Sequence, residues 1–402
     1  MFVYSDNAAT MPLSREAFEA MLPFLRDNFG NASSVYGVAR EAARALHGAR
    51  EDVARALGAK PEEIYFTGGG TESDNWALKG AAEARRARGR HIVTTAIEHH
   101  AVLHTAEYLG RQGCEITLLP VDERGLVSPE QVRDALRPDT ALVSVMLANN
   151  EIGTIEPIRE IAAVTRAHGA LFHTDAVQAV GHIPVDVTEL GVDLLSLAGH
   201  KFGGPKGVGA LYIRKGVRLP PLLHGGGHER GLRSGTENVA GAVGLAAALT
   251  RAVQTLPETM ALVAARRARV IDGLSRIPFS LLTGDPVRRL PGNISFVFEA
   301  VEGESLVLGL DMVGVCASSG SACSSGSLDP SHVLLAIGLP HEVAHGSLRL
   351  TISENNTEEE IDYLIEQVTN IVARSRRMSP LWNEETQSPT ERFWPQGVPA
   401  SL

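Results

Sequence analysis

The sequence predicts an α/β fold in two unequal parts, with a mostly parallel sheet in the larger part. Strand-like apolar runs alternate with helical segments from about residue 60 to 215, a pattern typical of a parallel sheet covered by helices on both faces. Near residue 258 the pattern changes to long helices and isolated strands, which indicates a second, smaller α+β domain. A chain of 402 residues that is 44% hydrophobic can bury two such cores.

Seven runs predict the strands of the larger sheet, each rich in apolar residues and bounded by turn residues. They span residues 64–67, 91–95, 116–119, 141–147, 171–174, 193–197 and 209–213. Two helices between them carry boundary signals. Ser128 begins a capping box with proline at the first helical position, and the helix opened by Pro157 is expected to stop at Gly169. Because ligands bind outside the carboxyl ends of parallel strands, we expect the site at that edge.

The smaller domain is predicted from a helix over 257–277, strands at 293–298 and 347–353, and a helix that follows the capping box begun by Thr357. We expect the large domain to span residues 15–257. The small domain is then residues 1–14 together with 258–378. The tail, residues 379–402, is either mobile or docked, and Trp382 and Trp394 favour docking.

Composition excludes several classes of function. A formal charge of −10 argues against general nucleic-acid binding, and no apolar run reaches membrane-spanning length. The first residues lack the basic and apolar regions of a signal peptide. Three cysteines without CxxC spacing argue against a disulfide framework or a zinc site. We therefore expect a cytoplasmic protein.

Lys201 follows the apolar run 192–197, directly after His200 and before a glycine-rich turn. A lysine at the mouth of a buried strand loses part of its hydration, which disfavours the ammonium form and frees the amine to attack a carbonyl. This pattern is typical of a lysine that binds pyridoxal phosphate covalently. The alternative is a surface lysine beside a turn.

Three further segments follow predicted strands. Gly70 and Thr71 precede a helix, where free backbone N–H groups and the helix dipole favour a phosphate, although an ordinary turn with Thr71 as the cap is the alternative. Asp175 could hold a pyridine nitrogen protonated or cap a helix. His99 could stack on a flat cofactor and move protons. We find no convincing set of metal ligands and expect no metal.

Cys323 lies near the centre of a run of small residues, 316–327, which can build neither a core nor a stable helix. A thiolate on such a segment could attack a substrate at one place and deliver the group it takes up at another. The alternative is that the cysteine has no function there. Cys114 and Cys316 adjoin apolar strand residues and are expected to be inert. Arg349, flanked by leucines, needs an anion, which is either a substrate carboxylate or a structural partner.

Taken together, these residues resemble the cysteine desulfurases, which are pyridoxal-phosphate enzymes of aminotransferase fold type I and class V. The resemblance covers nearly the whole chain. Its motifs are TESDN at 71–75, NNEIG at 149–153, GHK at 199–201, RSGT at 233–236 and SSGSAC at 318–323. The long small-residue segment around Cys323 resembles the branch that serves iron–sulfur cluster assembly.

The resemblance implies a role for each matched position. Lys201 binds the cofactor and moves the substrate α-proton, His99 stacks on the ring, and Cys323 accepts the sulfur of L-cysteine as a persulfide while L-alanine leaves. Other residues hold the cofactor or the substrate. Asp175 pairs with the ring nitrogen, Gln178 and Asn150 contact the ring hydroxyl, and Asn150 also lies near the substrate. Gly70, Thr71 and His200 bind the phosphate with Thr236 from the other subunit of a homodimer, and Arg349 binds the substrate carboxylate.

The chain departs from the family pattern at two cofactor positions. Ala198 stands where a serine is usual, so one hydrogen bond to the phosphate should be missing, and Gly70 stands where alanine is common. The rival functions are an aminotransferase or selenocysteine lyase of the same fold and a non-catalytic assembly scaffold. The expected sulfur acceptors are an iron–sulfur scaffold or a tRNA-thiolation relay.

Overall fold

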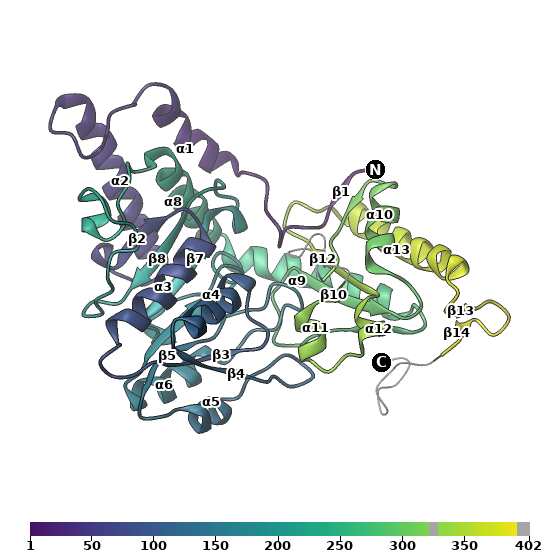
Figure 1. Ribbon diagram of the computed structural model, residues 1–402. Helices are drawn as coiled ribbons and strands as arrows, with labels where there is room; N and C mark the ends of the chain where they lie inside the picture. The colour runs from purple at the N-terminus through teal and green to yellow at the C-terminus, as the bar shows by residue number, and fades with distance from the viewer. Residues whose placement is uncertain (321–328, 392–402) are drawn as a thin grey trace.

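The computed structural model describes residues 1–320 and 329–391. Its larger sheet has seven strands in the order β2-β8-β7-β6-β5-β3-β4 (Figure 1). Strand β8 is antiparallel to both neighbours, and the other pairs are parallel. This confirms the predicted mostly parallel sheet. The strands are β2 (Ile64–Thr67), β3 (His91–Thr95), β4 (Glu115–Leu119), β5 (Thr140–Ser144), β6 (Leu171–Asp175), β7 (Leu194–Ala198) and β8 (Gly209–Ile213).

Helices cover both faces of this sheet, and alternate residues of one strand contact opposite layers. In β7, Leu194 packs in the cluster that contains Trp76 and Val102, whereas Leu195 packs with Val53 and Leu245. The helices of this part are α1 (Arg15–Arg26), α2 (Gly37–Ala56), α3 (Gly70–Ala84), α4 (His100–Arg111), α5 (Pro129–Ala135), α6 (Ile158–His168), α7 (Val187–Leu190) and α8 (Val239–Gln254).

The boundary signals act as the sequence predicts. Ser128 accepts from the N–H of Gln131, which completes the capping box at the start of α5. Helix α6 ends at Gly169, whose φ of 84° is left-handed and therefore favours glycine. Strand β5 is shorter than predicted and ends at Ser144.

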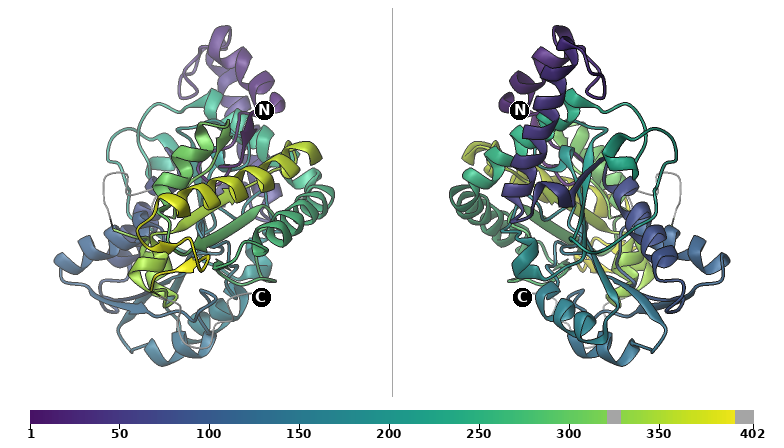
Figure 2. Two further views of the ribbon diagram at one scale, coloured as in Figure 1. Left: turned by 90° about the vertical axis from the view of Figure 1, so that its right-hand side faces the viewer. Right: turned by 90° about the vertical axis from the view of Figure 1, so that its left-hand side faces the viewer.

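A second core lies around a three-stranded antiparallel sheet of order β12-β10-β9. The long helices α9 and α13 pack together against this sheet (Figure 2). Thr357 caps α13 with a complete capping box, as predicted. The elements are α9 (Leu256–Ser275), β9 (Ser280–Leu282), β10 (Asn293–Phe298), α10 (Gly303–Asp311), β11 (Val315–Cys316), α11 (His332–Ala336), α12 (His341–Ala344), β12 (Ser347–Thr351) and α13 (Glu358–Met378).

The first residues of the chain connect the two sheets. Strand β1 (Val3–Tyr4) pairs in parallel with β11. Next, Asn7 donates from Nδ2 to the carbonyl of Thr351 (2.7 Å), and the N–H of Met11 donates to the carbonyl of His200 (2.9 Å). The segment 1–14 therefore runs from the small sheet to the turn that follows β7.

The described part of the tail docks on the small domain. Trp382, in the hairpin of β13 (Trp382–Asn383) and β14 (Ser388–Pro389), meets Phe279 edge to face at 5.7 Å and lies 4.6 Å from the Arg376 guanidinium. Trp394 lies outside the described residues. Among the described helices, no single one is long and apolar enough to cross a membrane. Helices α8 and α9, which are bent by 73° relative to each other, reach that length and composition only when they are taken together.

Candidate active site

A cavity of about 310 Å³ lies at the carboxyl ends of strands β5, β6 and β7. This is the edge at which the alternating pattern predicts a site. Nine predicted site residues line it: Gly70, Thr71, His99, Asn150, Asp175, Gln178, His200, Lys201 and Arg349. A wider cavity of about 770 Å³ shares the wall at Gly70, Thr71 and His200. The sheet therefore brings together side chains that are distant in the sequence.

Lys201 lies in the single turn that follows β7, with its amine at the N-terminal segment. Its Nζ donates to the carbonyls of Ala8 (2.6 Å) and Ala9 (2.9 Å). Gln178 donates from Nε2 to the same Ala8 carbonyl (2.9 Å). The two carbonyls thus fix the direction of the amine at the cavity wall.

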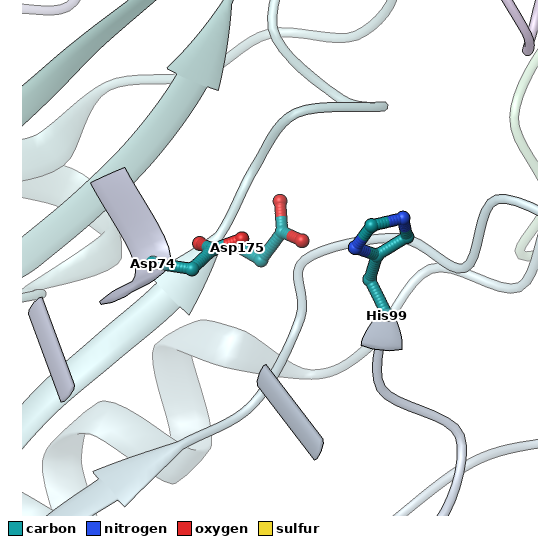
Figure 3. A group of neighbouring side chains, drawn as sticks. All are labelled: Asp74, His99 and Asp175. Carbon is teal, nitrogen blue, oxygen red and sulfur yellow. The ribbon is translucent and has the colours of Figure 1, made fainter. Parts of the chain in front are cut away.

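Asp175 ends β6 and lies between Asp74 and the ring of His99 (Figure 3). Its Oδ1 accepts from the N–H of Val177 (2.9 Å). Burial raises the pKa of Asp175 to about 6, although the Val177 N–H and the Lys201 charge oppose that rise. Burial raises the pKa of Asp74 well above its usual value, and the Asp175 charge raises it further. Of the two carboxyl groups, Asp175 therefore carries the negative charge. It would stabilise a positively charged group bound in the cavity.

His99 caps helix α4 and presents a neutral ring. Its Nδ1 accepts from the N–H of Ala101 (3.1 Å), so the proton of the neutral imidazole is on Nε2. Burial lowers the pKa of His99 to about 4, and the Lys201 charge lowers it further. The ring is consequently uncharged at neutral pH, so it can stack on a flat group and donate from Nε2.

Helix α3 presents its N-terminus to the shared wall of the two cavities. Gly70 and Thr71 supply its first turn, where backbone N–H groups have no partner within the helix. His200 adjoins this turn and contacts Oγ1 of Thr10 through Nδ1 (3.2 Å). A Cβ at Gly70 would lie 2.7 Å from Cγ2 of Val177 and 3.7 Å from Cβ of Ala198. A side chain at Gly70 would therefore have to displace the Val177 side chain, and the Ala198 methyl group faces the helix N-terminus.

Arg349, in β12, has a structural anion partner, one of the two alternatives that the sequence left open. It donates from Nη2 to Oδ1 of Asp6 (2.9 Å) and from Nη1 to the Asn150 carbonyl (3.2 Å). Its Nε is buried and has no acceptor in the part of the chain that the structure describes. An anion in the cavity would supply such an acceptor, so the structural ion pair leaves room for a carboxylate.

Two predicted residues are not among those that the structure describes in this cavity. Thr236 is exposed and lies outside its wall. Cys323 lies outside the described residues. Burial raises the pKa of Cys114 and of Cys316, which keeps these two thiols protonated, as expected of inert cysteines.

Sequence reasoning missed Asp74, Asp6 and the carbonyls of Ala8 and Ala9. Asp74 lies one helical turn after Thr71 on α3, so the periodicity of that helix could have pointed to it. No local pattern connects Asp6 with Arg349, because 343 positions separate them.

Asp74, His99 and Asp175 offer ligand atoms within 4.8 Å of one another, which is close enough together to hold a metal ion. However, the raised pKa of Asp74 favours its protonated form, and a protonated carboxyl is a poor ligand. The absence of a metal stays a prediction.

The family model for aminotransferase class V matches residues 3–364. The chain is 55% identical over 383 residues to a cysteine desulfurase IscS of Methanosarcina thermophila, an alignment that covers 95% of each chain. This chain belongs to the cysteine desulfurases. It is also 46% identical over 397 residues, 98% of each chain, to the cysteine desulfurase NifS of Azotobacter vinelandii. The solved structure of a NifS-like protein matches with a TM-score of 0.88 and 41% identity, and covers 93% of this chain and 100% of that one.

Pyridoxal phosphate is the cofactor of this desulfurase family, and the donor set of the cavity fits it. The site offers a primary amine on Lys201, a desolvated carboxylate on Asp175 and an open helix N-terminus at Gly70. These match the aldehyde, the ring nitrogen and the phosphate of the cofactor. The buried carboxylate supports this assignment most directly, because it requires a positive partner.

Ala198→Ser is expected to tighten binding of pyridoxal phosphate. The serine hydroxyl would face the N-terminus of α3, where the phosphate is expected, and could donate to it. A hydrogen bond to a charged group is worth about 1.5–3 kcal/mol, which is about tenfold to a hundredfold in affinity. The fraction of cofactor retained on dialysis measures the effect, with Ala198→Cys as a control of similar size and weaker donor strength. Equal retention by all three proteins would contradict the prediction.

Proposed function

We propose that this cysteine desulfurase transfers the sulfur of L-cysteine to Cys323 and from there to an acceptor protein. The carbon–sulfur bond of the substrate breaks and a sulfur–sulfur bond forms at Cys323. L-cysteine and the protein thiol thus become L-alanine and a protein persulfide, and no oxidant is required. The observation that carries the proposal is the cavity that brings Lys201, Asp175, His99 and Arg349 together.

The protein's own residues then bind, orient and move protons. Arg349 binds the substrate carboxylate through its free Nε, and the Lys201 amine, held at the cavity wall, moves the α-proton. When bound, pyridoxal phosphate withdraws electrons from the substrate α-carbon. Asp175 supports that withdrawal, since its charge holds the ring nitrogen protonated, and His99 stacks on the ring as a neutral imidazole.

The remaining cofactor contacts come from five positions. Gly70, Thr71 and His200 bind the phosphate at the start of α3. Gln178 and Asn150 lie on the wall where the ring hydroxyl would be held. Gln178 donates to the Ala8 carbonyl, one of the two acceptors of the Lys201 amine. Its orientation is therefore coupled to that of the lysine.

We infer that the enzyme is a homodimer in which Thr236 completes the partner's phosphate site. Thr236 is exposed and does not line the cavity of its own chain, although the family pattern places this threonine at the phosphate. A second copy would also cover exposed apolar side chains on α1 and the loop before α2, at the top of Figure 1: Phe18, Leu25, Phe29, Val35 and Tyr36. Sedimentation equilibrium should give twice the chain mass, and a fully active monomer would contradict the inference.

The acceptor is expected to be an iron–sulfur scaffold protein or a relay for tRNA thiolation, and a cytoplasmic location goes with either. The two described cysteines, Cys114 and Cys316, are free thiols, which supports a reducing compartment.

Product analysis tests the function. The holoenzyme supplied with L-cysteine and a reducing thiol should release equal amounts of alanine and sulfide. Release of a keto acid in place of alanine would identify an aminotransferase. Absence of both products, with cofactor bound, would favour the non-catalytic scaffold.

A further inference from the structure

Glu151 lies against described residues that flank the Cys323 segment, defined here as residues 321–328. It directly follows Asn150 and is only 6% exposed. Its N–H donates to Oδ1 of Asn149 (2.8 Å), and its carbonyl accepts from Nδ2 of Asn293 (3.0 Å). These two bonds fix its backbone, so the carboxyl group has a defined direction although it does not line the cavity.

The carboxylate of Glu151 reaches the described residue that caps α11. The hydroxyl of Ser331 donates to Oε2 of Glu151 and accepts from the N–H groups of Val333 (3.1 Å) and Leu334 (3.4 Å). A single hydroxyl therefore joins the start of a helix to the carboxylate. Ser331 is the third described residue after the Cys323 segment.

The chain that leads into the segment lies against the same pair. Gly320 is the last described residue before it, and a Cβ there would lie 3.2 Å from Cβ of Ser331 and 3.3 Å from Oε2 of Glu151. The N–H of Gly320 donates to Oγ of Ser347 (3.2 Å). Two residues earlier, Ser318 exchanges both backbone hydrogen bonds with Arg349 (2.7 and 3.1 Å). Gly320 and Ser331, which flank the segment, thus both lie at Glu151, beside the arginine of the cavity.

Charge supports a positional role for this residue. Burial raises the pKa of Glu151 to about 7, while the Ser331 hydroxyl and the Arg349 guanidinium oppose the rise. A buried carboxyl without a directly bonded cation costs stability, and an apolar residue of similar size would avoid that cost. The hydrogen bond to Ser331 is the interaction that an apolar residue could not make.

We propose that Glu151 is a positioning residue for sulfur transfer: it binds Ser331 and lies against Gly320, two described residues that flank the Cys323 segment, beside Arg349. The inference rests on the proposed role of Cys323. Since Glu151 does not touch the cavity, its removal should leave cofactor and L-cysteine binding intact. It should slow only the step that needs Cys323 in place.

The test uses the holoenzyme and compares Glu151→Ala, Glu151→Gln and Ser331→Ala with the parent protein. Two quantities are measured: the L-cysteine concentration that gives half of the cofactor's absorption change, and alanine release at saturating L-cysteine. Glu151→Ala and Ser331→Ala should each slow alanine release about tenfold or more, with half-saturation changed less than about threefold. Glu151→Gln keeps an oxygen acceptor for Ser331 and should restore most of the rate. The double alanine variant should be no slower than either single one.

Glu156→Gln is the matched control, because Glu156 is also buried and bonds the N–H of Val127 (3.1 Å) instead of Ser331. Its alanine release should equal that of the parent. The proposal is overturned by unchanged release in Ser331→Ala, by parallel loss of L-cysteine affinity, or by equal slowing in Glu156→Gln. If Glu151→Ala does not fold, the other two variants, Ser331→Ala and Glu151→Gln, still test the proposal. A parent protein that releases no alanine would instead refute the proposed function.

Discussion

Lys201→Ala is expected to abolish turnover of L-cysteine and to leave pyridoxal phosphate bound only reversibly. The variant lacks the amine that Ala8 and Ala9 hold at the cavity wall, and no other lysine lines this cavity among the described residues. Loss of proton transfer alone should lower the rate about a hundredfold to ten-thousandfold. Alanine release and the cofactor retained after dialysis measure the result.

Lys206→Ala is the matched control for this experiment. Lys206 is exposed, lies in the wall of the neighbouring cavity and does not line the smaller one. This variant should keep its activity. Borohydride reduction of the parent protein, followed by peptide mapping, should find the cofactor on the peptide that contains Lys201. Recovery of the cofactor on Lys206 would refute the assignment.

Cys323→Ser should still bind L-cysteine but should release alanine at least about a thousandfold more slowly than the parent. The substrate-binding groups, among them Arg349 and Lys201, are unchanged, whereas a hydroxyl is a far weaker nucleophile than a thiolate. The cofactor's absorption change on addition of L-cysteine measures binding, and alanine release measures transfer. In this variant the absorption change should persist, whereas alanine release should be slowed.

Cys316→Ser serves as the control, because the Cys316 thiol is protonated by burial and should contribute nothing to transfer. It should release alanine at the parent rate. Substantial alanine from Cys323→Ser would place the nucleophile elsewhere, with Cys316 the next candidate.

Sequence patterns predicted the strands well wherever pairing and burial coincide. The predicted strands at 64–67, 91–95 and 209–213 have the bounds of β2, β3 and β8. The run 141–147 is apolar throughout, yet β5 ends at Ser144. Its neighbour β3 ends at Thr95, and beyond that point the N–H of Met146 donates to Oε1 of Glu98 instead (2.9 Å). The residues beyond Ser144 are buried but are not paired on both sides. Their burial alone made the whole run look like a strand in the sequence.

The site was predictable to the extent that it follows strand ends. Lys201, Asp175 and His99 each come just after or at the end of a parallel strand, and the carboxyl-edge rule alone brings them together. Two other contacts depend on how segments distant in the sequence pack together. They are the ion pair of Arg349 with Asp6 and the hydrogen bonds from the lysine amine to the carbonyls of Ala8 and Ala9. No periodicity in the sequence encodes such crossings, so only the structure reveals them.

The path of residues 1–14 bears on when this enzyme becomes active during its synthesis. Strand β1 needs Val315 and Cys316, and Asp6 needs Arg349, so the segment that holds the Lys201 amine has no partner until most of the chain has left the ribosome. At about 5–20 residues per second, the wait for Arg349 is roughly 17–70 s. The large sheet can form from local units during that interval, while contacts across more than 300 positions are made last. Competence to bind cofactor productively is therefore a late event in translation, and a nascent chain released early would carry a folded sheet with an unfinished site.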